Sequence, residues 1–173
     1  MSRRRKQNDS SRLKEFQETN MSFWEGVEIY DSDHQKHKAS DVLKDKVVAL
    51  YFSAGWCMPC RQFTRKLKRF YEALKKSGKN FEIIFISKDK ESEDLKEYFD
   101  DHHGKWYYLA FGNPLIKEWC KKYEVKIIPT MKIIKDDGTA VVEDARTKVV
   151  EKGADKPIDL FDEWAAFSMK HKL

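Results

Sequence analysis

The sequence predicts an α/β domain built on a sheet that contains parallel strands. The continuous apolar run 47–52 has the pattern of a strand covered on both faces, and residues 81–86, apolar except for Glu82, form a second strand. Between them, apolar residues from Phe63 to Leu74 recur at spacings of 4, 3, 1 and 3, which is typical of one face of an amphipathic helix. A strand, a helix and a strand in this order form a right-handed unit with parallel strands, and sites form at the carboxyl ends of such strands.

Further elements are expected on both sides of this unit. In chain order we expect a strand or hairpin arm at 23–30, a polar loop at 31–38, a helical turn at 39–43, helices beginning at Ser92 and Pro114, a hairpin of strands 131–134 and 139–142, and an amphipathic helix at 157–169. The aromatic segment 106–111 has no pattern that fixes its structure.

Length and composition indicate one folded domain, residues 21–173, preceded by a flexible basic tail, residues 1–20. The chain has 173 residues, of which 40% are hydrophobic, enough for one full core. The tail holds six Lys or Arg against three acids, which leaves only +2 of the net +5 for the domain. This balance argues against nucleic-acid binding. The basic run at 3–6 is typical of a solvated tail, with a nuclear-import signal as the alternative.

The cysteines and the chain start predict the compartment. Three cysteines, Cys57, Cys60 and Cys120, do not describe a disulfide-stapled secreted domain. No apolar stretch follows the basic start, so no secretory signal is predicted, and no run approaches the ~20 apolar residues of a membrane span. We expect a reducing compartment, the cytoplasm or also the nucleus, and no membrane partner.

The pair Cys57 and Cys60 encloses a two-residue gap directly after the first buried strand. Pro59 is preset for a first helical turn, so Cys57 stands at a helix N-terminus, where backbone N–H groups stabilise a thiolate. The second sulfur lies about one turn further on, within reach of a small disulfide. Zinc is the alternative, but a closed site needs four ligands, and only Cys120 and scattered histidines remain. The spacing therefore predicts redox exchange and no metal.

This geometry predicts unequal roles for the two thiols. Cys57, at the turn, attacks a substrate disulfide, and Cys60, inside the helix, attacks Cys57 and releases the reduced substrate. Arg61 adds a nearby cation, whereas Met58 and Pro59 shape the turn. No Gly-x-Gly-x-x-Gly fingerprint is present, so we expect no bound cofactor and an external reductant.

The run Trp-Cys-Met-Pro-Cys-Arg at 56–61, with Ile-Pro-Thr at 128–130, resembles the thioredoxin superfamily. The run Tyr-Phe-Ser-Ala-Gly-Trp-Cys at 51–57 is similar to its nucleoredoxin and tryparedoxin branch. The resemblance covers roughly residues 21–167. It implies a thioredoxin-like fold with three α/β/α layers and a central mixed sheet. It also implies that Pro129 is cis and lies against the cysteines, and that the Ile128 backbone pairs with a substrate segment.

Several positions qualify this resemblance. Tyr51 stands where ordinary thioredoxins have a buried Asp; we expect it to pack in the core, with proton transfer as the alternative. Trp56 is expected to form a flat wall of the site. Met58 replaces the usual proline, and Lys88 stands where the branch commonly has Trp. Cys120 is expected to be a core residue, with a third redox thiol as the alternative.

The sequence therefore predicts an enzyme, a protein-disulfide reductase that acts on oxidised proteins and is recharged by a thiol reductant or a reductase system. The alternative is a redox-regulated module that binds a signalling partner with little turnover. We expect a monomer. Beyond the catalytic Cys57 and Cys60, the candidate supporting and substrate-binding residues are Trp56, Met58, Pro59, Arg61, Tyr51, Ile128 and Pro129.

Overall fold

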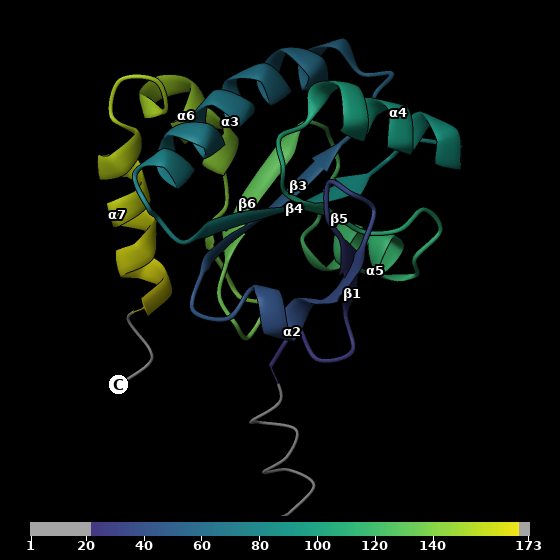
Figure 1. The fold of residues 1–173 in the computed structure, drawn as a ribbon, viewed down its shortest axis with the longest axis horizontal. Helices are drawn as coiled ribbons and strands as arrows, with labels where there is room; N and C mark the ends of the chain where they lie inside the picture. The colour runs from purple at the N-terminus through teal and green to yellow at the C-terminus, as the bar shows by residue number, and fades with distance from the viewer. Residues whose placement is uncertain (1–21, 170–173) are drawn as a thin grey trace, which may run out of the picture.

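Helices cover both faces of a seven-stranded mixed sheet in the computed structural model, which describes residues 22–169 (Figure 1). The expected tail, residues 1–20, lies outside the described residues. The elements in chain order are β1 (Glu28–Tyr30), β2 (Lys36–Lys38), α2 (Ala39–Val42), β3 (Val47–Ser53), α3 (Met58–Lys76), β4 (Phe81–Ser87), α4 (Ser92–His102), β5 (Tyr107–Tyr108), α5 (Leu115–Lys122), β6 (Thr130–Ile134), β7 (Ala140–Val142), α6 (Ala145–Lys152) and α7 (Pro157–Met169).

The sheet order is β2-β1-β5-β4-β3-β6-β7. Strands β3, β4 and β5 are parallel to one another, and the remaining pairs are antiparallel. The predicted parallel unit is therefore confirmed, with Val47 opposite Phe81 and Ser53 opposite Ser87. Because both strands end in register, the segments that follow Ser53 and Ser87 meet at one edge of the sheet.

Two apolar cores lie on opposite faces of the sheet. Alternate residues of β3 feed them: Tyr51 joins the core under α3, α4, α6 and α7, whereas Leu50 joins the core with α2 and α5. Both residues are fully buried. The two faces correspond to the helices above and below the sheet in Figure 1, so the implied three-layer architecture is confirmed.

The structure corrects three expectations about the fold. A strand or hairpin arm was predicted at 23–30, but only Glu28–Tyr30 form the strand β1. Phe23 lies outside the strand and packs on Trp119, with ring centroids 5.2 Å apart. Part of the polar loop 31–38 is the edge strand β2, which has no buried residue and so no apolar signal. Helix α6 was not predicted. It buries only Ala145 and Val149, and two apolar positions are too few to give a helical periodicity in the sequence.

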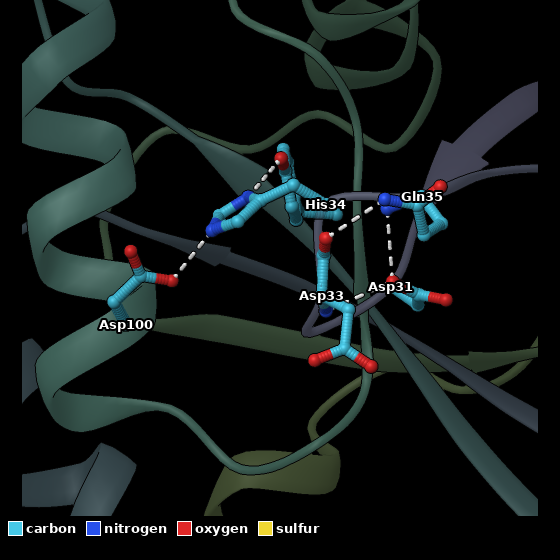
Figure 2. Close-up of polar contacts among 6 residues, drawn as sticks. Asp31, Asp33, His34, Gln35 and Asp100 are labelled. Carbon is cyan, nitrogen blue, oxygen red and sulfur yellow. Dashed lines mark hydrogen bonds and ion pairs between the residues drawn. The ribbon is translucent and has the colours of Figure 1, made fainter.

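The loop between β1 and β2 is tied to α4 by His34. Its Nε2 lies 2.9 Å from Asp100 Oδ1 (Figure 2). Its Nδ1 lies 2.7 Å from the Tyr108 hydroxyl. Within the loop, Asp31 Oδ1 accepts the backbone N–H of Gln35 at 3.0 Å. One side chain thus holds the β1–β2 loop against both α4 and β5.

We predict that Leu67→Ala, in the buried face of α3, lowers the free energy of unfolding by about 2–5 kcal/mol, because it leaves a cavity beneath the helix. Urea denaturation measures this loss. The exposed neighbour Lys66 provides the matched control, and Lys66→Ala is expected to change stability by less than about 0.5 kcal/mol. Equal effects of the two substitutions would contradict the packing described here.

Candidate active site

The strand–turn–helix junction places the first cysteine at a helix start. Strand β3 ends at Ser53, the Cys57 N–H donates to the Ala54 carbonyl at 3.2 Å, and Cys57 is the N-cap of α3. Pro59 lies in the first turn, where its missing N–H costs no helical hydrogen bond. The local structure follows the sequence prediction.

The two thiols differ in access. Cys57 Sγ accepts the backbone N–H of Cys60 at 3.3 Å and keeps 7% of its residue surface exposed. Cys60 is completely buried. Both are free thiols. A substrate disulfide can therefore reach the sulfur of Cys57 before it can reach that of Cys60.

Burial governs the protonation of the inner thiol. The pKa of Cys60 is raised to about 12, chiefly by burial and next by the hydrogen bond with Cys57, while hydrogen bonds from Ser53 and the Ala54 backbone act in the opposite direction. Cys60 is therefore a neutral thiol at neutral pH.

The cis proline lies beside the cysteines. The Ile128–Pro129 peptide bond is cis, as the resemblance implies. Pro129 is buried, and the Ile128 carbonyl oxygen lies 4.0 Å from Cys57 Sγ. The pairing of β6 with β3, which sets Thr130 opposite Phe52, carries this loop to the active-site turn. Residues about 70 positions apart thus share one site.

Three exposed apolar side chains belong to residues next in sequence to Cys57 and to Ile128, and they form what we call the apolar rim. Trp56 is 64% exposed, Met58 63% and Ile127 72%. The indole N–H of Trp56 donates to the Lys88 carbonyl at 3.4 Å, which orients the ring. The sequence analysis named Trp56 and Met58 but missed Ile127, whose only signal is its place directly before the Ile128 that contacts the cysteines.

The turn itself is held by charged side chains. Arg61 Nε donates to the Gly55 carbonyl at 2.5 Å, and the Gly55 N–H donates to Asp89 Oδ1 at 2.9 Å. Asp89 Oδ2 also accepts the Ser87 hydroxyl at 2.7 Å. A Cβ at Gly55 would lie 3.0 Å from Tyr98 Cβ, so glycine allows the close approach of α4. Asp89 lies in the run 86–89 that shares the family resemblance, but it was not predicted as a site residue, because its burial and its contact with Gly55 depend on the fold.

Hydroxyl groups fill the space behind Cys60. Tyr51 Oη lies 2.7 Å from Thr64 Oγ1, and Thr64 Oγ1 donates to the Cys60 carbonyl at 2.8 Å. Tyr98 Oη lies 2.7 Å from Thr64 Oγ1 and 2.8 Å from Ser53 Oγ. Tyr51 is packed in the core as expected, and burial raises its pKa well above the usual value. Ser53, Thr64 and Tyr98 were not predicted as site residues. Single hydroxyl residues in apolar segments carry no distinct sequence signal.

Cys120 lies apart from this cluster, on α5. It is half-buried at the edge of the second core, and Lys88 Nζ lies 3.7 Å from its sulfur. Within residues 22–169, no group of His, Cys, Asp or Glu could hold a metal ion. Over the same range, no helix is both long and apolar enough to cross a membrane.

The site combines a Cys-x-x-Cys at a helix start with a cis proline, on a mixed sheet that has helices on both faces. These features define the class of redox proteins of the thioredoxin type. The sequence model of a family described as Thioredoxin-like matches residues 45–140. The chain belongs to this family.

Named relatives refine the placement. A tryparedoxin of Trypanosoma brucei brucei is 42% identical over 113 residues, which are 63% of this chain and 75% of that protein. A probable nucleoredoxin 1 of Arabidopsis thaliana is 38% identical over 127 residues, 73% of this chain but only 22% of that protein. The crystal structure of a thioredoxin from Wuchereria bancrofti matches with 41% identity and a TM-score of 0.72, covering 84% of this chain and 99% of that one. The chain thus spans about a quarter of the length of the nucleoredoxins that it matches.

We predict that Cys60 does not titrate between about pH 5 and pH 9, because its pKa is raised to about 12. The 13Cβ chemical shift of Cys60 measures this directly. Since the folded state holds this proton more tightly than the unfolded chain, stability is expected to fall as pH rises from the ordinary thiol pKa of 9.0 toward 12. A Cys60 midpoint below 9 in the folded protein would contradict the burial argument. The urea-unfolded protein is the control and should titrate in the ordinary range.

Proposed function

We propose that this protein is a thiol–disulfide oxidoreductase that reduces disulfides in other proteins. The unequal burial of the two thiols carries the proposal: Cys57 reaches the surface within an apolar rim, and Cys60 is buried directly behind it. Membership of the thioredoxin-like family supports the general class of activity.

In the first step Cys57 is the nucleophile. The start of α3 and the Cys60 N–H stabilise a thiolate at Cys57 Sγ. This thiolate attacks one sulfur of a substrate disulfide, the substrate S–S bond breaks, and the second substrate sulfur leaves as a thiolate. The product is a mixed disulfide between Cys57 and the substrate.

In the second step Cys60 resolves the mixed disulfide. The Cys60 sulfur loses its proton and attacks Cys57 Sγ, the bond from Cys57 to the substrate breaks, and the leaving substrate sulfur takes up a proton. The substrate leaves fully reduced, and the protein holds a Cys57–Cys60 disulfide. An external thiol or reductase system must supply two electrons to reopen it.

The surface around Cys57 suits an extended protein segment. Trp56, Met58 and Ile127 offer exposed apolar contacts, and the Ile128 backbone next to Cys57 offers polar groups for pairing with the substrate main chain. We therefore propose oxidised proteins as substrates. The small number of cysteines supports a reducing compartment, the cytoplasm or the nucleus, as the place of action.

The same apolar rim favours a second candidate function, a redox-regulated binding module. In that role the protein would hold a partner through Trp56, Met58 and Ile127, and oxidation of the cysteines would only change the affinity. Catalytic turnover separates the two functions, because a binding module needs none.

We predict that the protein accelerates the reduction of insulin by dithiothreitol, measured as the onset of turbidity. Cys57→Ser is expected to abolish the acceleration, because it removes the attacking sulfur. Cys120→Ser is the matched control and should keep full activity, since Cys120 lies on α5 outside the site. Wild-type protein with no activity above the uncatalysed rate would support the binding module instead. A fully active Cys57→Ser variant would contradict the proposed mechanism.

We also predict that Ile127→Ser raises the KM for insulin about 3- to 10-fold with little change in kcat, because it removes an apolar contact from the rim without touching the cysteines. The second-order rate of iodoacetamide with Cys57 should stay unchanged and serves as the control. An unaltered KM would show that this edge of the rim does not contact substrate.

A further inference from the structure

Charge is divided unevenly between two neighbouring helices on one face of the sheet. Helix α3 carries seven Lys or Arg against one acid, Glu72, whereas α4 carries five Asp or Glu against one Lys, Lys96. The two helices lie side by side over the same core (Figure 1). Since residues 21–173 together carry a net charge of only +2, that range without α3 is negative on balance.

The exposed cations of α3 that lie toward the active site form a stripe. Arg65, Lys66 and Arg69 are exposed, and a helix with about 3.6 residues per turn places all three within about 100° of arc. We call these three residues the basic stripe. The rise of about 1.5 Å per residue sets Arg65 about 12 Å and Arg69 about 18 Å along the helix from Cys57. The stripe therefore begins about two turns from the reactive sulfur.

The described part of the chain does not neutralise the basic stripe. Within residues 22–169, no ion pair includes Arg65, Lys66 or Arg69. Glu72 follows Arg69 by three residues but forms none of these ion pairs either. Arg65 and Arg69 are four residues apart, a spacing at which like charges destabilise a helix. The stripe thus lowers the stability of α3, and no ion pair in the described fold offsets this.

Stabilisation of a thiolate at Cys57 does not explain the basic stripe. At physiological ionic strength, charges in water are screened over about 8 Å, and the stripe lies further than this from Cys57. The groups that do lie close are the Cys60 N–H, which contacts Cys57 Sγ, and Arg61, which donates to the Gly55 carbonyl. The charge of the stripe is therefore available to a molecule outside the chain.

The position of the stripe indicates what this molecule is. An extended peptide covers about 3.3 Å per residue, so a substrate bound at Cys57 reaches the stripe about four to six residues from its own cysteine. Carboxylates at those positions would meet three cations. Within residues 58–76, no aromatic side chain is exposed on which a nucleic-acid base could stack. The exposed acids Glu93, Asp94 and Glu97 of the adjacent α4 would also repel a long polyanion. A short acidic segment of a protein fits best.

We propose that the basic stripe docks an acidic segment of the substrate protein while the substrate disulfide lies at Cys57. This inference rests on the proposed function and narrows its substrate class to proteins with Asp or Glu about four to six residues from the reactive cysteine. The stripe steers the encounter, so it raises the rate at which substrate reaches Cys57, and added salt weakens this effect. The chemistry of the two thiols is unchanged.

Two synthetic peptides test this docking in the full chain carrying Cys120→Ser. Each peptide has a single cysteine, joined in a disulfide to 5-thio-2-nitrobenzoate. One peptide has Glu at the fourth to sixth positions on either side of the cysteine, and the other has Gln there. Cys57 attacks the peptide sulfur, the bond to thionitrobenzoate breaks, and this coloured thiolate leaves with the electron pair. Stopped-flow absorbance gives the second-order rate constant for each peptide.

At an ionic strength of about 20 mM, the Glu peptide is expected to react about 3- to 10-fold faster than the Gln peptide, and about equally fast at about 0.5 M. The triple variant Arg65→Gln, Lys66→Gln, Arg69→Gln should lose this preference and keep its rate with the Gln peptide. Its reaction with iodoacetamide, a neutral reagent for Cys57, should also be unchanged, because the stripe does not act on the thiolate.

The triple variant Lys36→Gln, Lys38→Gln, Lys44→Gln is the matched control. It removes the same charge from exposed residues far from the site. Strand β2, which holds Lys36 and Lys38, is four places from β3 in the sheet, and Lys44 precedes β3 whereas Cys57 follows it. This variant should keep the full preference for the Glu peptide.

Four outcomes overturn the inference. Equal rates for the two peptides at low ionic strength would show that the stripe does not steer substrate. Equal losses of preference in the two triple variants would show an effect of net charge alone. A slower reaction of the stripe variant with iodoacetamide would assign the stripe to the Cys57 thiolate. Binding of single-stranded oligothymidine that the stripe variant loses, without a preference between the peptides, would assign the stripe to nucleic acid.

Failure of the proposed function has a different signature. Both peptides would then release thionitrobenzoate but remain bound to Cys57, because Cys60 would not resolve the mixed disulfide. Mass spectrometry of the reacted protein detects this directly. If only the inference fails, both peptides are released at equal rates and the protein still holds a Cys57–Cys60 disulfide.

Discussion

The site depends on the hydrogen bond from the Cys60 N–H to Cys57 Sγ at the first turn of α3. At this turn the outer sulfur lies at the helix N-terminus, and the inner sulfur is buried among Ala54, Cys57 and Ile128. Everything that makes the two cysteines different follows from this arrangement. Cys57 Sγ accepts a backbone N–H at the helix start, while burial favours the neutral thiol at Cys60, whose pKa is raised to about 12.

The surrounding fold keeps this junction in place. The parallel register of β3 and β4 brings Ser53 and Ser87 to one edge, and Asp89 then reaches back to hold the Gly55 N–H. On the other side, the pairing of β6 with β3 delivers the cis proline and the Ile128 carbonyl. The site is thus assembled from four neighbouring strand ends and helix starts, and only one of them carries the cysteines.

Much of this was predictable because strong local patterns encode it. The apolar runs of β3 and β4 and the spacing along α3 predicted the parallel unit, and the Cys-x-x-Cys placed the thiols on it. The cis proline came only from the resemblance, since no local pattern links Pro129 to Cys57. Ser53, Thr64 and Tyr98 could not be predicted, because a hydroxyl cluster depends on how α3, α4 and β3 pack. Edge strand β2 and helix α6 bury too little for a periodic signal.

The central claim is that Cys57 and Cys60 act as one dithiol. It is tested most directly by mass spectrometric mapping of the disulfides in the protein after it has reacted with an equimolar amount of an oxidised protein substrate. If the two thiols act together, the maps will show an intramolecular Cys57–Cys60 disulfide, a reduced substrate and a free Cys120 thiol. The claim would be contradicted by a disulfide that involves Cys120. It would also be contradicted if Cys57 and Cys60 were still free thiols although the substrate had been reduced.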